Sequence, residues 1–145
     1  MSTITKIDGR SRMRFLPAHY GPAMMGVEGR VFTYAHQALT DYSGGSWDFA
    51  ETETGAGVLI PPEPDSGPGV YRWIAGERWG GDQTDLSREA AGLALTTLAV
   101  NHELWKVSER PELEATARRL STEWERLMET VYQHPESDAL MQILD

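Results

Sequence analysis

Residues 41–49 read DYSGGSWDF and bring together the end of a predicted helix, two consecutive glycines and the start of a predicted strand. In the segment before them, apolar residues recur at helical spacing as far as Tyr42, which predicts a helix from about residue 22 to residue 42. Gly44 and Gly45 can adopt positive φ angles at little cost, so they are suited to end a helix and turn the chain. We therefore expect the chain to leave the helix here and enter a sheet.

The residues after the glycines alternate between aromatic and polar. Trp47 and Phe49 are separated by Asp48, which is the period of a half-buried strand, so a strand is predicted over residues 46–52. Two large aromatic side chains on one strand face favour a core between a helix and a sheet. We expect both rings to belong to that core rather than to a binding surface.

Two carboxylates flank the glycine break and allow two interpretations. In the first, Asp41 ends the helix and Asp48 accepts hydrogen bonds from turn amides, a structural role that we prefer. In the alternative, the protein is a small acid/base enzyme in which Asp41, Asp48 or His36 acts at a site around the glycines.

The rest of the first half predicts more strands and no long helix. Pro17 and the pair at residues 21–22 oppose one continuous helix, and a short connection is expected through residues 19–22, after residues 14–17. Strands are predicted over residues 57–60, over residues 70–75 and around Trp79, with the Pro- and Gly-rich residues 61–69 as an exposed hairpin loop.

The second half predicts helices. Ser87 is a suitable N-cap, Pro111 suits the first turn of the next helix, and His134 before a proline ends it. His102 and Trp105 fall on the apolar face of the first of these helices, so both are expected to pack inward. The predicted fold class is α+β: a meander of three to four antiparallel strands with about four helices, in a single domain over residues 1–145. Within it, residues 1–13 are expected to form a flexible arm or an edge strand.

The net charge of −9 is unevenly distributed. Residues 1–30 hold five basic and two acidic side chains, whereas the other 115 residues hold eight basic and twenty acidic ones. An acidic body repels phosphates, which makes direct DNA binding unlikely, and it favours contact with the basic surface of another protein.

Several kinds of chemistry have no signature in the sequence. There are no cysteines, the four histidines lack metal-ligand spacing, and the two glycines follow a helix instead of forming a phosphate loop after a strand. We expect no cofactor and no metal. No apolar run is long enough to span a bilayer, so a cytoplasmic location is expected.

The stretch at residues 41–49 resembles the signature of the plasmid antirestriction proteins of the ArdB/KlcA type. Similar positions follow in the same order at residues 14–17 upstream, at residues 86–92, and at residues 134–136 before the C-terminal residues 143–145. The motif positions are Arg14, Phe15, Leu16, Pro17, Asp41, Tyr42, Gly44, Gly45, Trp47, Asp48 and Phe49. The resemblance implies a non-enzymatic inhibitor of type I restriction-modification, encoded by a mobile element.

If the motif residues are mostly core and turns, they do not mark the surface that contacts a partner. We expect that surface on the acidic helix faces, and it is assigned to Glu123, Glu125, Glu129 and Asp145. The partner would be a restriction subunit or an accessory host factor. An acidic interaction module unrelated to restriction remains the third interpretation.

Overall fold

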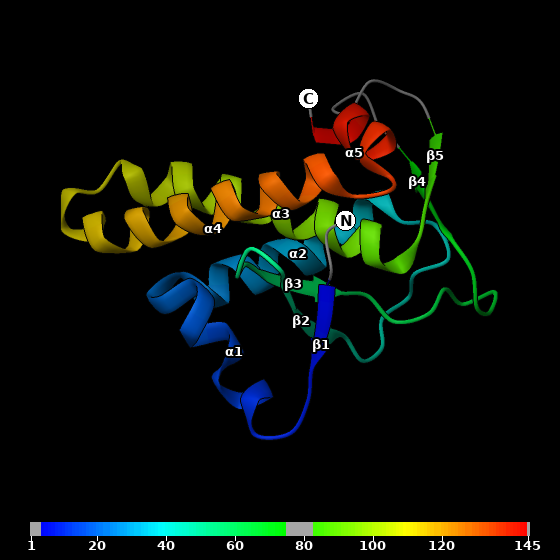
Figure 1. Ribbon diagram of the computed structural model, residues 1–145, viewed down its shortest axis with the longest axis horizontal. Helices are drawn as coiled ribbons and strands as arrows, with labels where there is room; N and C mark the ends of the chain where they lie inside the picture. Colours follow the sequence, from blue (N-terminus) through cyan, green and yellow to red (C-terminus); the bar gives the residue numbers. More distant parts are fainter. Residues whose placement is uncertain (1–3, 75–82, 145) are drawn as a thin grey trace.

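The computed structural model describes residues 4–74 and 83–144 and has five strands and five α-helices within them (Figure 1). The elements in chain order are β1 (Ile4–Ile7), α1 (Ser11–Tyr20), α2 (Met24–Ala38), β2 (Asp48–Thr52), β3 (Gly57–Ile60), β4 (Tyr71–Ile74), β5 (Gln83–Leu86), α3 (Arg88–Ser108), α4 (Glu114–Gln133) and α5 (Ser137–Leu144). Short 3-10 turns, η1 (Gly21–Ala23) and η3 (Pro111–Leu113), lead into α2 and α4. The predicted strand around Trp79 lies outside the described residues.

The α+β class is confirmed, and the strands are divided between two antiparallel sheets. β1, β2 and β3 form one sheet in that order, with β1 at its edge, and β4 pairs with β5 in the other. Residues 61–69 therefore connect two sheets, and the prediction that they form a hairpin loop is wrong. A second sheet was not predictable from strand patterns, because alternation marks a strand but not its neighbour.

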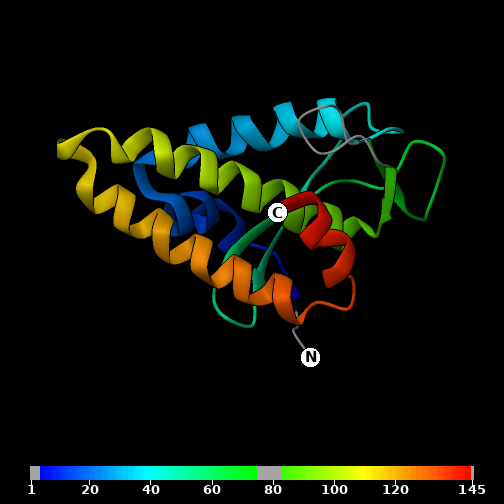
Figure 2. The same ribbon diagram turned by 90° about the horizontal axis from the view of Figure 1, so that it is seen from above.

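Helix α3 is the central element of the molecule (Figure 2). It lies between α2 and α4, and β3 packs against its N-terminal half. A Cβ atom at Gly92 would lie 2.5 Å from the carbonyl oxygen of Leu59, so only glycine allows this close approach. The backbone N–H of Leu59 donates to the hydroxyl of Thr96 at 3.0 Å, which joins the sheet to the helix inside the core.

The start of the chain differs from the prediction. α1 continues through Pro17 to Tyr20, so the expected connection is wrong at residues 19–20, whereas the predicted interruption at residues 21–22 is confirmed by the 3-10 turn that begins at Gly21. The predicted helix over residues 22–42 is shorter, because its last turn is replaced by pairing with β4. Leu39 adopts extended angles and bridges to Trp73, and the N–H of Thr40 donates to the carbonyl of Arg72 at 3.1 Å.

The C-terminal helices begin and end where the sequence predicts. The Ser87 hydroxyl caps α3 by accepting the N–H of Ala90 at 3.1 Å, and His134 ends α4 in an extended conformation. The chain then reverses into α5, which lies over the furrow between α3 and α4 and runs back toward the middle of that pair (Figures 1 and 2). Within the described ranges, every helix is too short or too polar to cross a membrane.

Candidate functional site

The glycine break is held by hydrogen bonds to the loop after β3. Asp41 has a positive φ of 60°, and Gly44 and Gly45 have φ angles of 117° and 125°. The carbonyl of Asp41 accepts the N–H of Asp65 at 2.8 Å, and its carboxylate accepts the hydroxyl of Ser66 at 2.5 Å. The break and the loop therefore fix each other. Because α2 ends at Ala38, the prediction that Asp41 ends the helix is wrong.

Asp48 has different partners from Asp41. Its carboxylate lies 3.1 Å from the Arg88 guanidinium at the start of α3 and 3.5 Å from the Lys6 ammonium on β1. Arg88 also donates to the carbonyl of Pro61 at 2.8 Å. The two aspartates thus tie separate pairs of elements together, and they share no partner that would make them an acid/base pair. The expectation that Asp48 bonds turn amides is replaced by this ion pair.

The aromatic residues of the stretch are packed. Trp47 is 7% exposed and lies just before β2, where its Nε1 donates to the Tyr42 hydroxyl at 3.0 Å and its ring contacts Phe32. Phe49 is half-buried and stacks on Phe15 with ring centroids 4.6 Å apart. The two motif segments that lie apart in the sequence, residues 14–17 and 41–49, therefore meet where Phe15 stacks on Phe49.

Two buried tyrosines, Tyr20 and Tyr71, donate hydrogen bonds to backbone carbonyls. The Tyr71 hydroxyl donates to the carbonyl of Pro62 at 2.6 Å, and burial, with a smaller effect of Asp65, raises the pKa of Tyr71 to about 12. The Tyr20 hydroxyl donates to the carbonyl of Gly57 at 2.9 Å, and its burial raises its pKa well above the ordinary value. Both hydroxyls are therefore neutral hydrogen-bond donors near pH 7.

The prediction that Glu123 belongs to an exposed acidic face is wrong. Glu123 is 4% exposed, accepts the backbone N–H of Gly57 at 2.9 Å, and lies 3.1 Å from Nδ1 of His19. The other ring nitrogen of His19 lies 3.2 Å from Glu51. The physical reason is helix geometry: two residues correspond to about 200° of rotation, so Glu123 and Glu125 point to opposite sides of α4.

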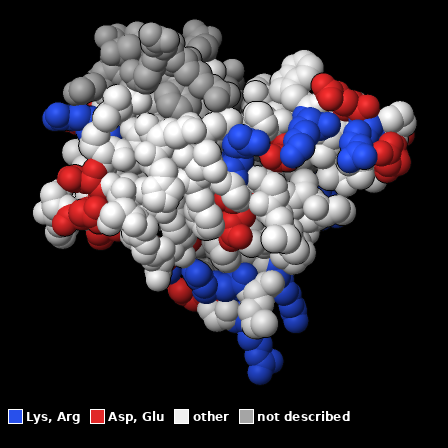
Figure 3. Space-filling model, turned by 180° about the vertical axis from the view of Figure 1, so that it is seen from behind, with Lys and Arg blue, Asp and Glu red and all other residues white. Residues whose placement is uncertain are grey.

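Glu125 and Glu129 lie one turn apart on the exposed side of α4, and Asp145 lies outside the described residues. Two arginines of α4 contact neighbouring elements. Arg119 donates to the carbonyls of Pro17 and Ala18, and the Arg126 guanidinium lies beside the turn between β2 and β3. Acidic and basic side chains alternate at the α3–α4 end of the molecule, whereas basic side chains project at the α1 end (Figure 3).

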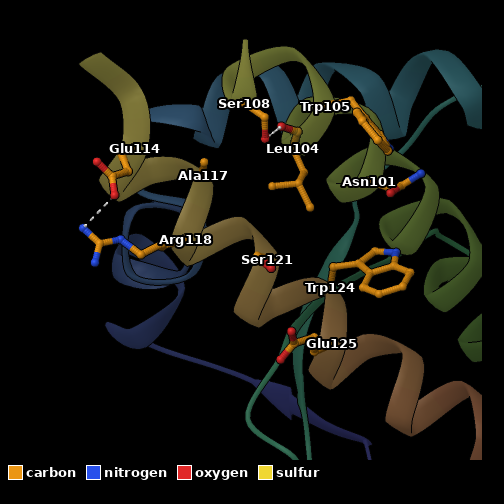
Figure 4. A pocket seen from close by; sticks show the side chains of 10 residues that line it. All are labelled: Asn101, Leu104, Trp105, Ser108, Glu114, Ala117, Arg118, Ser121, Trp124 and Glu125. Carbon is orange, nitrogen blue, oxygen red and sulfur yellow. Dashed lines mark hydrogen bonds and ion pairs between the residues drawn. The ribbon is translucent and has the colours of Figure 1, made fainter. Parts of the chain in front are cut away.

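A surface that the sequence did not predict lies between the C-terminal half of α3 and the N-terminal half of α4. A hollow of about 510 Å³ opens there, and Leu104 and Trp124 lie between the two helices in it (Figure 4). Trp105, expected to pack inward, is 70% exposed at its edge. His102, also expected inward, is half-buried. The polar residues at 101, 102, 106, 108 and 109 surround Trp105 in the sequence and were the available signal of an exposed face.

The sequence profile of the family described as "Antirestriction protein" matches residues 40–145. The chain belongs to the antirestriction protein family. The matched region begins one residue before the stretch at residues 41–49 and includes every element from β2 onward. The family resemblance seen at residues 41–49 is confirmed.

Curated relatives cover almost the whole chain. YafX of Escherichia coli K12, described as uncharacterized, is 30% identical over 99% of this chain and 88% of its own length. The antirestriction protein KlcA of Escherichia coli is 27% identical over 97% of this chain and 92% of its own length.

A solved structure has the same fold. The match has a TM-score of 0.78 at 23% sequence identity, and it covers 99% of this chain and 95% of the solved chain. That structure belongs to a study of KlcA and ArdB, whose title reports a novel fold and antirestriction activity against type I DNA restriction systems in vivo but not in vitro.

Proposed function

We propose that this protein inhibits type I restriction-modification in the cytoplasm by contacting another protein, without catalysing a reaction itself. The observation that carries the proposal is the match to the antirestriction family over residues 40–145. The activity against type I systems reported for the matching KlcA and ArdB structures supports the choice of restriction class.

The arrangement of the motif residues supports a contact mechanism. The stretch at residues 41–49 is occupied with packing, turn and ion-pair contacts, and its two aspartates have separate partners. The exposed carboxylates of Glu125 and Glu129 are instead open to solvent and, within the described ranges, have no ion-pair partner. Such a surface can attract a basic protein and speed its association.

The partner is a restriction subunit or a host factor that acts with it. An effect seen in cells and not with purified components, as the matching study reports for KlcA and ArdB, is the pattern that a missing third component produces. We propose that the same holds for this chain.

The test is transfer of an unmodified plasmid into cells that carry a type I system, with and without this gene. Expression is expected to restore transfer toward the level of a plasmid without recognition sites, while host methylation persists. Unchanged restriction in expressing cells would contradict the proposal. Loss of methylation would instead indicate an effect on the modification activity.

The surface is tested by charge reversal. Glu125→Lys with Glu129→Lys is expected to reduce protection at least about tenfold, an effect of the size that 1.4 kcal/mol of lost binding energy produces. Asp8→Lys with Glu53→Lys is the matched control, because it makes the same change of charge at exposed positions near the three-stranded sheet. Equal protection by both double variants would contradict a role of this face.

A further inference from the structure

The furrow between α3 and α4 is half filled by this chain's own helix. α5 contacts both helices, and its Leu140 and Ile143 are buried there. On α3, Ala94 and Thr97 are buried, and they lie about two turns and one turn before Asn101 on the side of the helix that also holds Trp105. The furrow is thus a surface that accepts an apolar helix along its length.

Beyond the end of α5 the same furrow continues without a cover. The hollow of about 510 Å³ begins where Asn101 and Trp124 face each other and extends to Ser108 and Glu114 (Figure 4). The stretch from residue 114 to residue 125 corresponds to about 16 Å of helix at 1.5 Å per residue. Three turns of a helix fit this length.

The floor and edge of the open half are apolar. Leu104, Ala117 and Trp124 are half-buried in it, and Trp105 stands 70% exposed on its α3 side. A second hollow of about 460 Å³, lined by Leu98 among others, shares Asn101 and Trp105 with the first. An exposed tryptophan that lines two hollows is the kind of large, rigid anchor that dominates binding interfaces.

The charges on the α4 side of the furrow are predominantly acidic. Glu114 and Glu125 line it together with Arg118. The ion pair between Arg118 and Glu114 is 3.9 Å long between side chains that are three-quarters exposed, so it is weak and leaves Glu114 able to contact a partner. Arg119, which would otherwise neutralise this side, binds carbonyls of α1.

We propose that the open half of the furrow binds an amphipathic helix of a partner protein, about three turns long, with large apolar residues on one side and Lys or Arg beside them. The occupant's apolar side packs on Leu104, Trp105 and Trp124, in line with α5, and its basic residues lie against Glu114 and Glu125. This mode is helix-in-groove recognition, with anchors spaced i, i+3 or i+4, and i+7. The inference rests on the proposed contact mechanism and names the surface and the chemistry of the partner.

The probe is a displayed library of 14-residue helical peptides with varied apolar and charged faces, selected against the full chain. Enrichment of basic amphipathic helices is expected. Trp105→Ala is expected to weaken the best peptide at least about tenfold, and Glu125→Lys about three- to fivefold, in fluorescence anisotropy. Met13→Ala is the matched control, because Met13 is 85% exposed on α1 and outside the furrow, and it should change binding less than twofold.

A blocking variant tests the site without removing a contact. Ser121→Arg places a bulky cation on the α4 side and is expected to abolish binding of the same peptide, with circular dichroism and the melting temperature confirming the fold. Failure to enrich helices, enrichment of acidic ones, or binding that ignores Trp105→Ala and Ser121→Arg would overturn the proposal. A dimer in sedimentation velocity that dissociates on Trp105→Ala would also overturn it, since the occupant would be a second copy.

The plasmid-transfer assay separates this inference from the proposed function. Trp105→Ala is expected to lower protection at least about tenfold while Met13→Ala preserves it. If the wild type protects and Trp105→Ala protects equally well, the furrow is not the docking site and the proposed function stands. If the wild type does not protect, the proposed function fails, and the peptide measurements still decide whether the furrow binds a basic helix.

Discussion

The glycine break and the outer face of the α3–α4 pair use the same residue types in opposite ways. At the break, Trp47 is buried and Asp48 is ion-paired. On the outer face, Trp105 is exposed and Glu125 faces solvent. The first region carries the family's motif and the second carries none of it. The comparison teaches that a recognisable motif here identifies the fold, while a free surface must be found from the tertiary structure.

The sharpest test of this contrast compares the two tryptophans. Trp47→Ala removes a buried ring and its hydrogen bond to Tyr42, so it should lower the free energy of unfolding by about 3–5 kcal/mol. Trp105→Ala should change it by less than about 0.5 kcal/mol, because the ring is mostly exposed. Urea unfolding measures the free energy of unfolding of both variants. Equal losses would contradict the contrast between a buried and an exposed tryptophan.

The two sides of α4 provide the second test. Glu123→Ala leaves the buried N–H of Gly57 without an acceptor and removes the partner of His19 Nδ1, and should destabilise the protein by about 1–3 kcal/mol. Glu125→Ala should be neutral within about 0.5 kcal/mol. Glu123→Gln, which retains an acceptor for the Gly57 N–H, should recover part of the loss. A neutral Glu123→Ala would show that the buried contact is unimportant.

The glycines themselves give a smaller effect. Gly45→Ala is expected to destabilise the protein by about 1–3 kcal/mol, because φ is 125° and a Cβ would lie 3.1 Å from the Pro62 ring. Gly44→Ala meets no neighbouring atom within 4 Å, although its φ of 117° is also unfavourable, so its effect should be smaller. The melting temperatures of the two variants measure this difference. A larger loss for Gly44→Ala than for Gly45→Ala would contradict the importance of the contact with Pro62.

Tyr71 gives the smallest effect and a pH dependence. Tyr71→Phe removes the hydrogen bond to Pro62 and should lower stability by about 1 kcal/mol at pH 7. Because folding raises the pKa of Tyr71 from 10.0 to about 12, the wild type should lose stability as the pH rises from 10 toward 12, as the unfolded chain ionises first. The phenylalanine variant lacks this loss, so the difference between the two should shrink with pH. A constant difference in urea unfolding at pH 9, 10 and 11 would contradict the raised pKa.

The local patterns that the sequence encodes were sufficient for much of this protein. Helical spacing, the Ser87 cap and the proline after His134 predicted the second half of the chain, because these signals act over a few residues. The motif positions predicted the family and the burial of Trp47. Strand alternation found β2 and β4 but could not show which strands pair, so the division into two sheets came only from the structure.

Exposure was decided by the tertiary arrangement. Glu123 and Glu125 are both acidic residues of one amphipathic helix, and only the position of α1 and β3 shows that the first is buried. Trp105 follows an apolar pattern along α3, yet its side chain is 70% exposed, because an apolar pattern does not show which turns of a helix are covered by other elements. The sequence by itself determined the helices of the second half, the glycine turn and the family. Which faces remain free depends on where distant elements stop, and that is a property of packing between segments far apart in the chain.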